Sequence, residues 1–436
     1  MANALLEKYA KRLAISEGVH NKSFGEAMSS AKKIAVANCL HNITKYMNEA
    51  FDNSVGTQRA DLGAWKKFAL DLTTVAVPNL IAFDLVAVQP MSSVVGYITY
   101  VQFTAGTNKG NTRQGDVLND PFRLGNVDTE YTSERVVETV TVDGEGKATL
   151  AWFPVVNTDT VKPELVGAAA GATITVTDAK KGEVTIANLG EGVTTAKVRY
   201  VYDNIVVPQN DLPILNARME GITLQARARR IAVYYSQIAA FQAKNDHGID
   251  LESQLAEKAC GQLAYEIDTE ITQLLIDNAD SDSDLVWSKT LPTGVNKADH
   301  YEGFSEIVEI ARQRIYDRTK KYGPNYMLIA SNILPVLTFI KGFTAASTSN
   351  INGPYLAGTL NGLKVFVTPN IDAGKFVIGV NNNELQATAA VYAPYMAVVP
   401  TQLLGFADGG MQQGWSTMYD LKLLNKDLLI AGRITA

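Results

Sequence analysis

The chain has 436 residues and a formal net charge of −6 at pH 7, and 46% of its residues are hydrophobic. This length allows a sizeable core but is too great for one compact unit, so about two or three lobes are expected. The acidic balance, with Lys and Arg scattered along the chain, excludes a protein whose main task is to grip nucleic-acid phosphates. The N-terminus lacks the apolar run of a signal peptide, which indicates synthesis in a cytoplasm.

The cysteines and the apolar stretches exclude two further classes. Cys39 and Cys260 are the only cysteines, and each lies in a segment patterned as a helix. Free buried thiols are therefore favoured over a disulfide. The most apolar stretches are interrupted by prolines or an aspartate, well short of a spanning helix, so we expect no membrane insertion.

The N-terminal part of the chain favours helix. From Gly25 to Phe51 the sequence is rich in Ala, Lys and Asn, and its apolar residues form only a ragged stripe. Such a helix needs a partner surface. Residues 52–65 contain two glycines and are expected to form a loosely structured arm, before a first strand-like run from Thr73 to Val88.

Between about Gly106 and Asn204 apolar and polar residues alternate, which is typical of half-buried antiparallel strands. The apolar positions are Val140, Val142, Ala148, Leu150, Trp152, Ala196, Val198, Tyr200 and Tyr202. Turn residues recur between these runs, as at Lys181-Gly182. The pattern predicts a small β domain inserted between the two limbs of a long hairpin.

Two amphipathic helices are expected after a basic, helix-friendly stretch that follows Pro213. The first has Asp250 as its N-cap and ends near Asn278. Its apolar stripe consists of Ala256, Cys260, Leu263, Ile267, Ile271 and Leu274. The polar run Asp277 to Asp284 is interpreted as a solvated acidic linker. The second helix spans Gly303 to Lys321, with Phe304, Ile307, Val308, Ala311 and Ile315 facing inward.

The rest of the chain alternates strands and short helices, which is typical of a mixed α/β lobe. The expected segments are Tyr326 to Ala330, Ile333 to Ile340, Leu363 to Thr368, Lys375 to Val380 and Thr388 to Tyr392. The segments Ser416 to Leu424 and Asp427 to Ile434 then predict two strands joined as a hairpin at Asn425-Lys426.

No motif of catalysis or metal binding stands out. The chain has no G-x-S-x-G, no H-E-x-x-H and no G-x-G-x-x-G that opens a helix after a strand. Gly144 to Lys147 resembles a phosphate loop, but Ala148 stands where Ser or Thr should bind magnesium. Asp280, Asp282 and Asp284 copy the first ligands of a calcium loop without its Gly and Glu. We therefore expect no enzyme, no metal and no cofactor.

One basic run has two interpretations. Arg227, Arg229 and Arg230 precede the aromatic residues Tyr234 and Tyr235, a combination that can contact nucleic acid. Pairing with acidic residues at a subunit interface is preferred, because no clustered basic face persists beyond this segment.

Two segments resemble a known family. Asp84 to Gly96 reads Asp-Leu-Val-Ala-Val-Gln-Pro-Met-Ser-Ser-Val-Val-Gly, and Tyr97 to Phe103 follows. It resembles the entry into the long extended loop of T-even-like myophage major capsid proteins, although Val94 stands where that family usually has Pro. Far downstream, Tyr392-Ala393-Pro394-Tyr395-Met396 is similar to the aromatic-x-Pro-Tyr-Val stretch of the same family.

The resemblance implies the α+β, Hong Kong 97-like phage capsid fold, with an all-β insertion domain in the extended loop. It divides the chain into an N-terminal arm with helices (1–65), a peripheral-domain strand and the start of the extended loop (66–107), the extended loop with its β insertion (108–206), the loop return and the peripheral domain with a long spine helix (207–285), an α/β axial domain (286–405), and C-terminal strands that complete the peripheral domain (406–436).

The function that the resemblance implies is that of a structural major capsid protein of a tailed double-stranded DNA bacteriophage. Copies assemble into hexamers and pentamers of an icosahedral head, which encloses DNA without sequence-specific binding. Further implied partners are portal, scaffold and vertex or decoration proteins, and the implied location is the phage head after synthesis in the host bacterial cytoplasm. Open alternatives are an encapsulin-like compartment shell, a carbohydrate-binding or adhesin protein that uses the β insertion, and an uncharacterised hydrolase.

A mobile arm and a projecting hairpin cannot hide their apolar faces within one subunit, so we expect them to bury these faces on neighbouring copies. The candidate assembly residues are Trp65, Phe68, Gln89, Pro90, Met91, Arg227, Arg229, Arg230, Tyr392, Pro394 and Tyr395. Ile15-Ser16-Glu17-Gly18 is similar to the hydrophobic-x-Glu sites that prohead proteases cut, which gives the hypothesis that residues 1–17 are removed. The terminus of the mature particle, measured by mass spectrometry, tests it.

Overall fold

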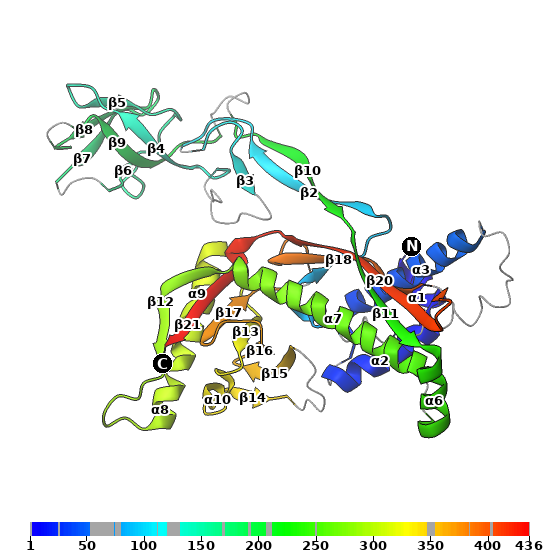
Figure 1. The fold of residues 1–436 in the computed structure, drawn as a ribbon. Coiled ribbons are helices and arrows are strands. Elements are labelled where there is room, and N and C mark those ends of the chain that lie inside the picture. The colour runs from blue at the N-terminus through cyan, green and yellow to red at the C-terminus, as the bar shows by residue number, and fades with distance from the viewer. Residues whose placement is uncertain are drawn as a thin grey trace. The chain divides into compact units, whose positions relative to one another are not determined.

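The computed structural model describes residues 2–24, 27–52, 74, 80–110, 112–119, 131–167, 171–190, 193–205, 212–248, 251–346, 354–382, 384–401 and 404–435. The chain divides into two compact units, unit 1 (Met1–Ile98 and Ile222–Ala436) and unit 2 (Thr99–Gly221). Figure 1 shows their helices and strands. The mixture confirms the α+β class. Trp65, Phe68 and Asp250 lie outside the described residues.

The N-terminal part of unit 1 is helical. Its helices are α1 (Ala2–Lys8), α2 (Ala10–Phe24) and α3 (Ser30–Asp52). The helix expected from Gly25 is thus confirmed from Ser30 onward. Val36, Leu40 and Ile43 are fully buried, whereas Tyr46 is 45% exposed, and α3 packs against strand β18 (Ala390–Pro400) of the same chain. Strand β18 of the same chain therefore supplies the partner surface that this helix was expected to need.

A seven-stranded sheet forms one part of unit 1. Its strand order is β12 (Asp280–Ser288), β21 (Leu429–Thr435), β17 (Lys375–Gly379), β13 (Tyr326–Ala330), β16 (Leu363–Thr368), β15 (Tyr355–Leu360) and β14 (Phe343–Ala345). The pairs β12/β21 and β13/β16 are parallel and the others antiparallel. Every residue of β13 is buried, as a central strand requires.

Three helices accompany this sheet. They are α8 (Lys297–Glu302), α9 (Phe304–Thr319) and α10 (Leu334–Leu337). The expected helix from Gly303 to Lys321 is confirmed, and Phe304, Val308, Ala311 and Ile315 are fully buried. The 3.6-residue period of these apolar side chains therefore marked the face that packs against β12 and β21.

A second sheet carries the long helix. It contains β1 (Ala87–Val88), β18, β20 (Gly410–Leu423) and β11 (Arg227–Ser236), and β19 (Leu404–Gly405) pairs with β20. Helix α6 (Gln237–His247) precedes α7 (Leu251–Asp277), which packs against β11 and β20. The predicted long helix and its stripe are confirmed, except that Leu274 is only half-buried and Leu275 beside it is fully buried.

Unit 2 holds a stem and the inserted β domain. In the stem, which we define as residues 99–119 and 212–221, β2 (Val95–Ala105) lies between β10 (Leu215–Gln225) and β3 (Val117–Asn119). The inserted β domain, residues 131–205, has two three-stranded sheets. Their orders are β4 (Arg135–Thr141), β9 (Thr195–Val201), β6 (Glu164–Leu165), and β5 (Lys147–Thr149), β8 (Glu183–Ala187), β7 (Thr173–Asp178). The predicted alternation is confirmed, because the two sheets share one core.

Two segments differ from their predicted secondary structure. The run from Thr73 to Val88 contains, in its described part, helix α5 (Ala82–Leu85) and only two strand residues. A carboxylate on α7 accepts hydrogen bonds from the first backbone N–H groups of that turn, a long-range contact that local propensity does not contain. The stretch after Pro213 forms strands β10 and β11 instead of a helix, because all ten residues of β11 pair with β20.

The acidic run is not a solvated linker. Asp280, Asp282 and Asp284 lie on strand β12 and form ion pairs with two arginines of α9. Arg314 pairs with both Asp282 and Asp284, and Arg318 Nη1 lies 3.2 Å from Asp280 Oδ2. Because these ion pairs neutralise the aspartates, the acidic segment can form the edge strand of the sheet.

The expected C-terminal hairpin is also wrong. Strand β20 belongs to the second sheet, whereas β21 lies between β12 and β17 in the seven-stranded sheet. The 3₁₀ turn Lys426–Leu428 separates them, and Asn425 Oδ1 accepts a hydrogen bond from Asp427 N at its start (2.9 Å). Range 406–436 therefore contributes to both sheets, and range 286–405 includes β18 of the second sheet.

Candidate functional site

The two segments that carry the family resemblance form one hydrogen-bonded joint. Strands β1 and β18 are parallel neighbours, with Ala87 opposite Val391 and Val88 opposite Tyr392. The ladder continues beyond β1, because Gln89 N donates to Tyr392 O (3.0 Å) and Met91 N donates to Pro394 O (2.9 Å). Pro90 has no N–H group and occupies the position between these two donors.

Asn42 of α3 completes this joint. Its side-chain Nδ2 donates to Met91 O (2.7 Å) and to Tyr395 O (2.8 Å), so both amide hydrogens are used. The Asn42 side chain is buried, and one residue of the N-terminal helix therefore links both motif segments. Sequence analysis missed Asn42, although an asparagine within the apolar stripe of α3 was a signal that could have identified it.

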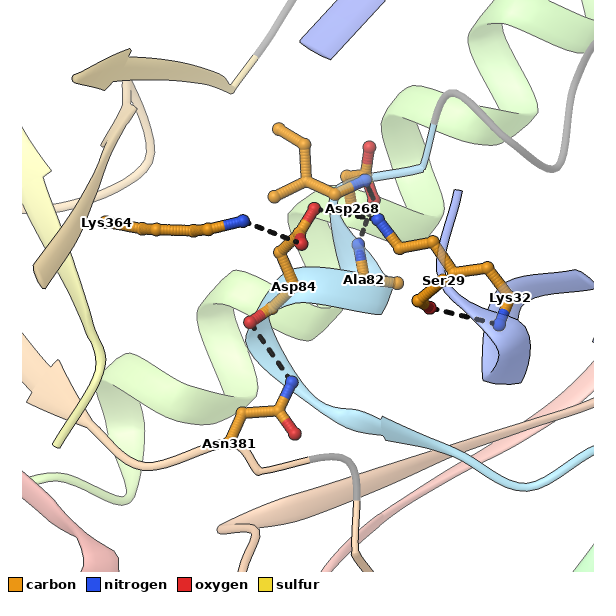
Figure 2. Close-up of polar contacts among 8 residues, drawn as sticks. Ser29, Lys32, Ala82, Asp84, Asp268, Lys364 and Asn381 are labelled. Atoms are coloured by element: carbon orange, nitrogen blue, oxygen red, sulfur yellow. Dashed lines mark hydrogen bonds and ion pairs between the residues drawn. The ribbon is translucent and has the colours of Figure 1, made fainter. Parts of the chain in front are cut away.

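Asp84, the first residue of the first motif, is the centre of a second contact set (Figure 2). Lys32 Nζ of α3 lies 3.1 Å from Asp84 Oδ2, and Lys364 Nζ of β16 lies 3.6 Å from Asp84 Oδ1. The backbone carbonyl of Asp84 accepts a hydrogen bond from Asn381 Nδ2 at 3.1 Å. The Lys32 and Asp84 side chains are both largely buried, so removal of either partner would leave an uncompensated charge.

Asp268 of α7 holds the start of α5. Its Oδ1 accepts hydrogen bonds from Ile81 N (3.1 Å) and Ala82 N (3.3 Å), two donors without a partner inside the short helix. Burial raises the pKa of Asp268 to about 7, while these two N–H groups act in the opposite direction. Together, Asp84 and Asp268 tie α3, α5, α7 and the seven-stranded sheet to one point of unit 1.

The predicted motif residues differ in exposure. Met91, Tyr392 and Pro394 are buried, and Met91 packs in a core cluster with Ile98, Leu224, Ala226, Val391 and Ala393. Pro90 and Tyr395 are half-buried, and Gln89 is exposed. The buried members stabilise the subunit itself. A role in subunit contacts stays a prediction for the exposed ones.

The three predicted arginines lie on β11 but do not act together. Arg229 forms ion pairs with Glu270 and Glu266 of α7, and its guanidinium carbon lies 5.6 Å from the centre of the Tyr419 ring. Tyr419 also donates a hydrogen bond to Glu270. Arg229 therefore fastens α7 to the sheet within one chain. Arg227 and Arg230 are exposed, and their role at a subunit interface stays a prediction.

The proposed protease site lies in the middle of α2. Ile15 is exposed, and Glu17 Oε1 lies 2.9 Å from Lys33 Nζ of α3. Cleavage there requires local unwinding of α2, and its occurrence stays a prediction. Over the described ranges, we find no cluster of three or more His, Cys, Asp or Glu side chains that could hold a metal ion. Nor does any helix in that part of the chain have the length and apolar character to cross a membrane.

Comparison with known proteins places this arrangement in a family. The family model "Major capsid protein Gp23" matches residues 62–424, a range that includes both motif segments and the inserted β domain. The chain belongs to this family. The chain is 24% identical over 382 residues to the major capsid protein of Enterobacteria phage T6, covering 74% of this chain and 71% of the relative. The T4 protein is 23% identical over 369 residues (74% and 68%), and that of Vibrio phage KVP40 is 20% identical over 375 residues (74% and 69%).

Solved structures with a similar chain path include a Microbacterium phage Oxtober96 chain, with a TM-score of 0.36 and 13% identity over 64% of this chain and 95% of that one. The holo-SrpI encapsulin complex of Synechococcus elongatus has a TM-score of 0.35 and 11% identity over 50% and 77% of the two chains.

The Asn42 joint gives a first prediction. Asn42→Ala removes both donors and leaves two buried carbonyl groups without a partner, which should lower the free energy of unfolding by roughly 2 kcal/mol. Asn38→Ala is the matched control, because Asn38 Nδ2 donates only to Ile34 O of the same helix (3.0 Å). Urea unfolding of the purified chain measures the free energy of unfolding of both variants. Equal losses in the two variants would show that Asn42 does not stabilise the joint.

Asp268 gives a pH-dependent prediction. Its pKa is about 7 in the folded chain, above the value of about 3.9 expected after unfolding. Between these pH values only the unfolded state releases the proton, so stability falls as pH rises from about 4 to 7 and stays low above. Asp268→Asn keeps an acceptor for Ile81 N and Ala82 N and cannot ionise. We expect it to stabilise the chain by on the order of 3 kcal/mol at pH 8 and by nothing near pH 4.

Thermal melting across this pH range checks the result. Asp317→Asn, which replaces an exposed carboxylate on α9, is the control and should leave the pH profile unchanged. A profile for Asp268→Asn parallel to that of the parent chain would show that the pKa of Asp268 is the same in the folded and unfolded chain and would contradict the prediction.

Proposed function

We propose that this chain is the structural major capsid protein of a tailed double-stranded DNA bacteriophage. The observation that carries the proposal is the match to the Gp23 family over residues 62–424. The hydrogen-bonded joint between the two motif segments supports it, because the residues that resemble the family are those that hold α3 and β18 together.

The proposed mechanism is assembly. Copies of the chain form hexamers and pentamers of an icosahedral head, and each extended loop overlaps an adjacent subunit. Exposed apolar side chains on β2 and β10 support this role: Tyr97, Val101, Phe103, Leu215 and Met219. An apolar surface of this kind on a strand pair is unfavourable in water and becomes favourable when another copy covers it. Many such contacts add up in a closed shell.

The charge of the chain supports enclosure of DNA without adhesion. A net charge of −6 disfavours adhesion to a polyanion. The proposed partners are therefore other copies of the chain, with portal, scaffold and vertex or decoration proteins at specialised positions. The proposed location is the phage head after synthesis in the bacterial host, and no catalytic step is part of the proposal.

A loop variant tests the assembly mechanism. Met219 on β10 is 73% exposed, so Met219→Asp should leave the folded subunit intact. We expect particle formation to fall roughly tenfold or more, because a carboxylate would be buried at the subunit contact. Thr173→Asp places the same charge on an exposed strand of the inserted β domain and serves as the control. Sedimentation and electron microscopy measure the yield, and wild-type yield for Met219→Asp would contradict a contact at this face.

The content of the particle separates the alternatives. Particles purified from infected cells and treated with nuclease should retain double-stranded genomic DNA. A shell that holds a cargo protein and no DNA would favour the encapsulin-like alternative. A chain that stays monomeric and binds glycans would favour the adhesin alternative.

A further inference from the structure

Within unit 2, the stem and the inserted β domain each insert one side chain into the other. Tyr131 opens the inserted β domain, and Lys109 follows the end of β2 in the stem. The side chain of each residue makes contacts across this junction, and both residues are almost completely buried. Such reciprocal burial is unusual for a domain that is only tethered by flexible connections.

Tyr131 reaches into the stem. Its ring packs in a small core with Ala105 of β2 and Leu118 of β3. Its hydroxyl lies 3.0 Å from the carbonyl oxygens of both Thr107 and Ile214, and Thr107 N donates to it at 3.3 Å. Thr107 follows β2 and Ile214 precedes β10. The Tyr131 hydroxyl therefore contacts both segments of the stem at the end that adjoins the inserted β domain.

Lys109 reaches in the opposite direction. Its side chain is 3% exposed, and its ammonium donates to Tyr131 O (2.9 Å) and to Ser133 O. The ammonium also lies 5.7 Å from the centre of the Trp152 ring and 5.1 Å from that of Tyr202, both core residues of the inserted β domain. Carbonyl acceptors and aromatic faces are the groups that compensate a buried cation.

The backbone at this junction leaves no room for a side chain at Gly110. Gly110 follows Lys109 with a φ of +59°, a conformation that favours glycine. A Cβ atom at Gly110 would lie 2.7 Å from the carbonyl oxygen of Val137 on β4. The turn at the end of the stem is therefore in direct backbone contact with a strand of the inserted β domain.

We infer that Lys109 and Tyr131 are positioning residues that fix the inserted β domain to the stem as one rigid body. The domain is then presented at a set orientation at the end of the loop, whatever it contacts there. This inference depends only on the contacts within unit 2 and stands independently of the proposed function.

Spin-label distances test this rigidity in the full chain. Gln114→Cys in the stem and Thr139→Cys on β4 place labels at exposed positions on the two sides of the junction. The native Cys39 and Cys260 are buried, and burial raises the pKa of each thiol to about 12, so they react slowly. Labelled chains are diluted in unlabelled protein, and the width of the distance distribution is measured.

We expect a narrow distribution for the parent and a width increased roughly twofold for Lys109→Met, because the removed ammonium leaves two carbonyl groups and two rings without their partner. Lys197→Met, on the exposed face of β9, is the matched control and should keep the parental width. Hydrogen exchange of the β4 and β9 amides is recorded in parallel. A broader distance distribution with retained amide protection supports the positioning role of Lys109. A loss of domain stability alone would instead reduce the amide protection.

Tyr131→Phe is the second variant. It keeps the ring and removes only the hydroxyl, so it decides the matter if Lys109→Met unfolds the inserted β domain. A broader distribution with protected amides supports the inference. A parental width in Tyr131→Phe and in any folded Lys109→Met protein, or a broad distribution in the parent, would overturn it.

Discussion

Buried backbone carbonyl groups need donors, and this constraint governs the centre of unit 1. The hydrogen bonds between the β1 and β18 segments satisfy their backbone groups as far as the bond from Met91 N to Pro394 O. The carbonyls of Met91 and Tyr395 then depend on a side chain from elsewhere. Asn42 supplies it, and α3 is thereby placed on β18 with its apolar stripe covered. The position of the N-terminal helix thus follows from the end of a two-residue strand.

The buried carboxylates nearby also need partners, and an uncompensated buried charge costs more free energy than an unpaired carbonyl group. Asp84 is compensated by Lys32 and Lys364, each from a different element. Asp268 Oδ1 accepts hydrogen bonds from two backbone N–H groups, and burial raises the pKa of its carboxyl group. One carboxylate therefore has two lysine partners, whereas burial pushes the other toward its neutral form, although both hold the same short helix in place.

Periodicity in the sequence predicted the elements whose packing face is continuous. Helices α7 and α9 and the strands of the inserted β domain were identified in this way, because their apolar residues recur at 3.6 or 2 positions. Strand β11 was missed because its arginines and alanines also favour a helix, and β12 was missed because its aspartates are neutralised by Arg314 and Arg318 from another element. Asn42, Lys109 and Asp268 act through partners far away along the chain, which a local pattern does not contain. The sequence likewise did not predict which motif residues are exposed, because the burial of Met91 and Tyr392 depends on the tertiary arrangement.

The separation of β20 and β21 into different sheets has a consequence for biosynthesis. Strand β21 is the last in chain order, yet it lies between β12 and β17 near one end of the seven-stranded sheet. While a ribosome is still translating the preceding residues, β12 has no neighbour in that sheet and one edge of β17 is unpaired. Closure of the sheet therefore requires synthesis as far as Thr435, and a product that stops before Leu429 would expose open strand edges to aggregation.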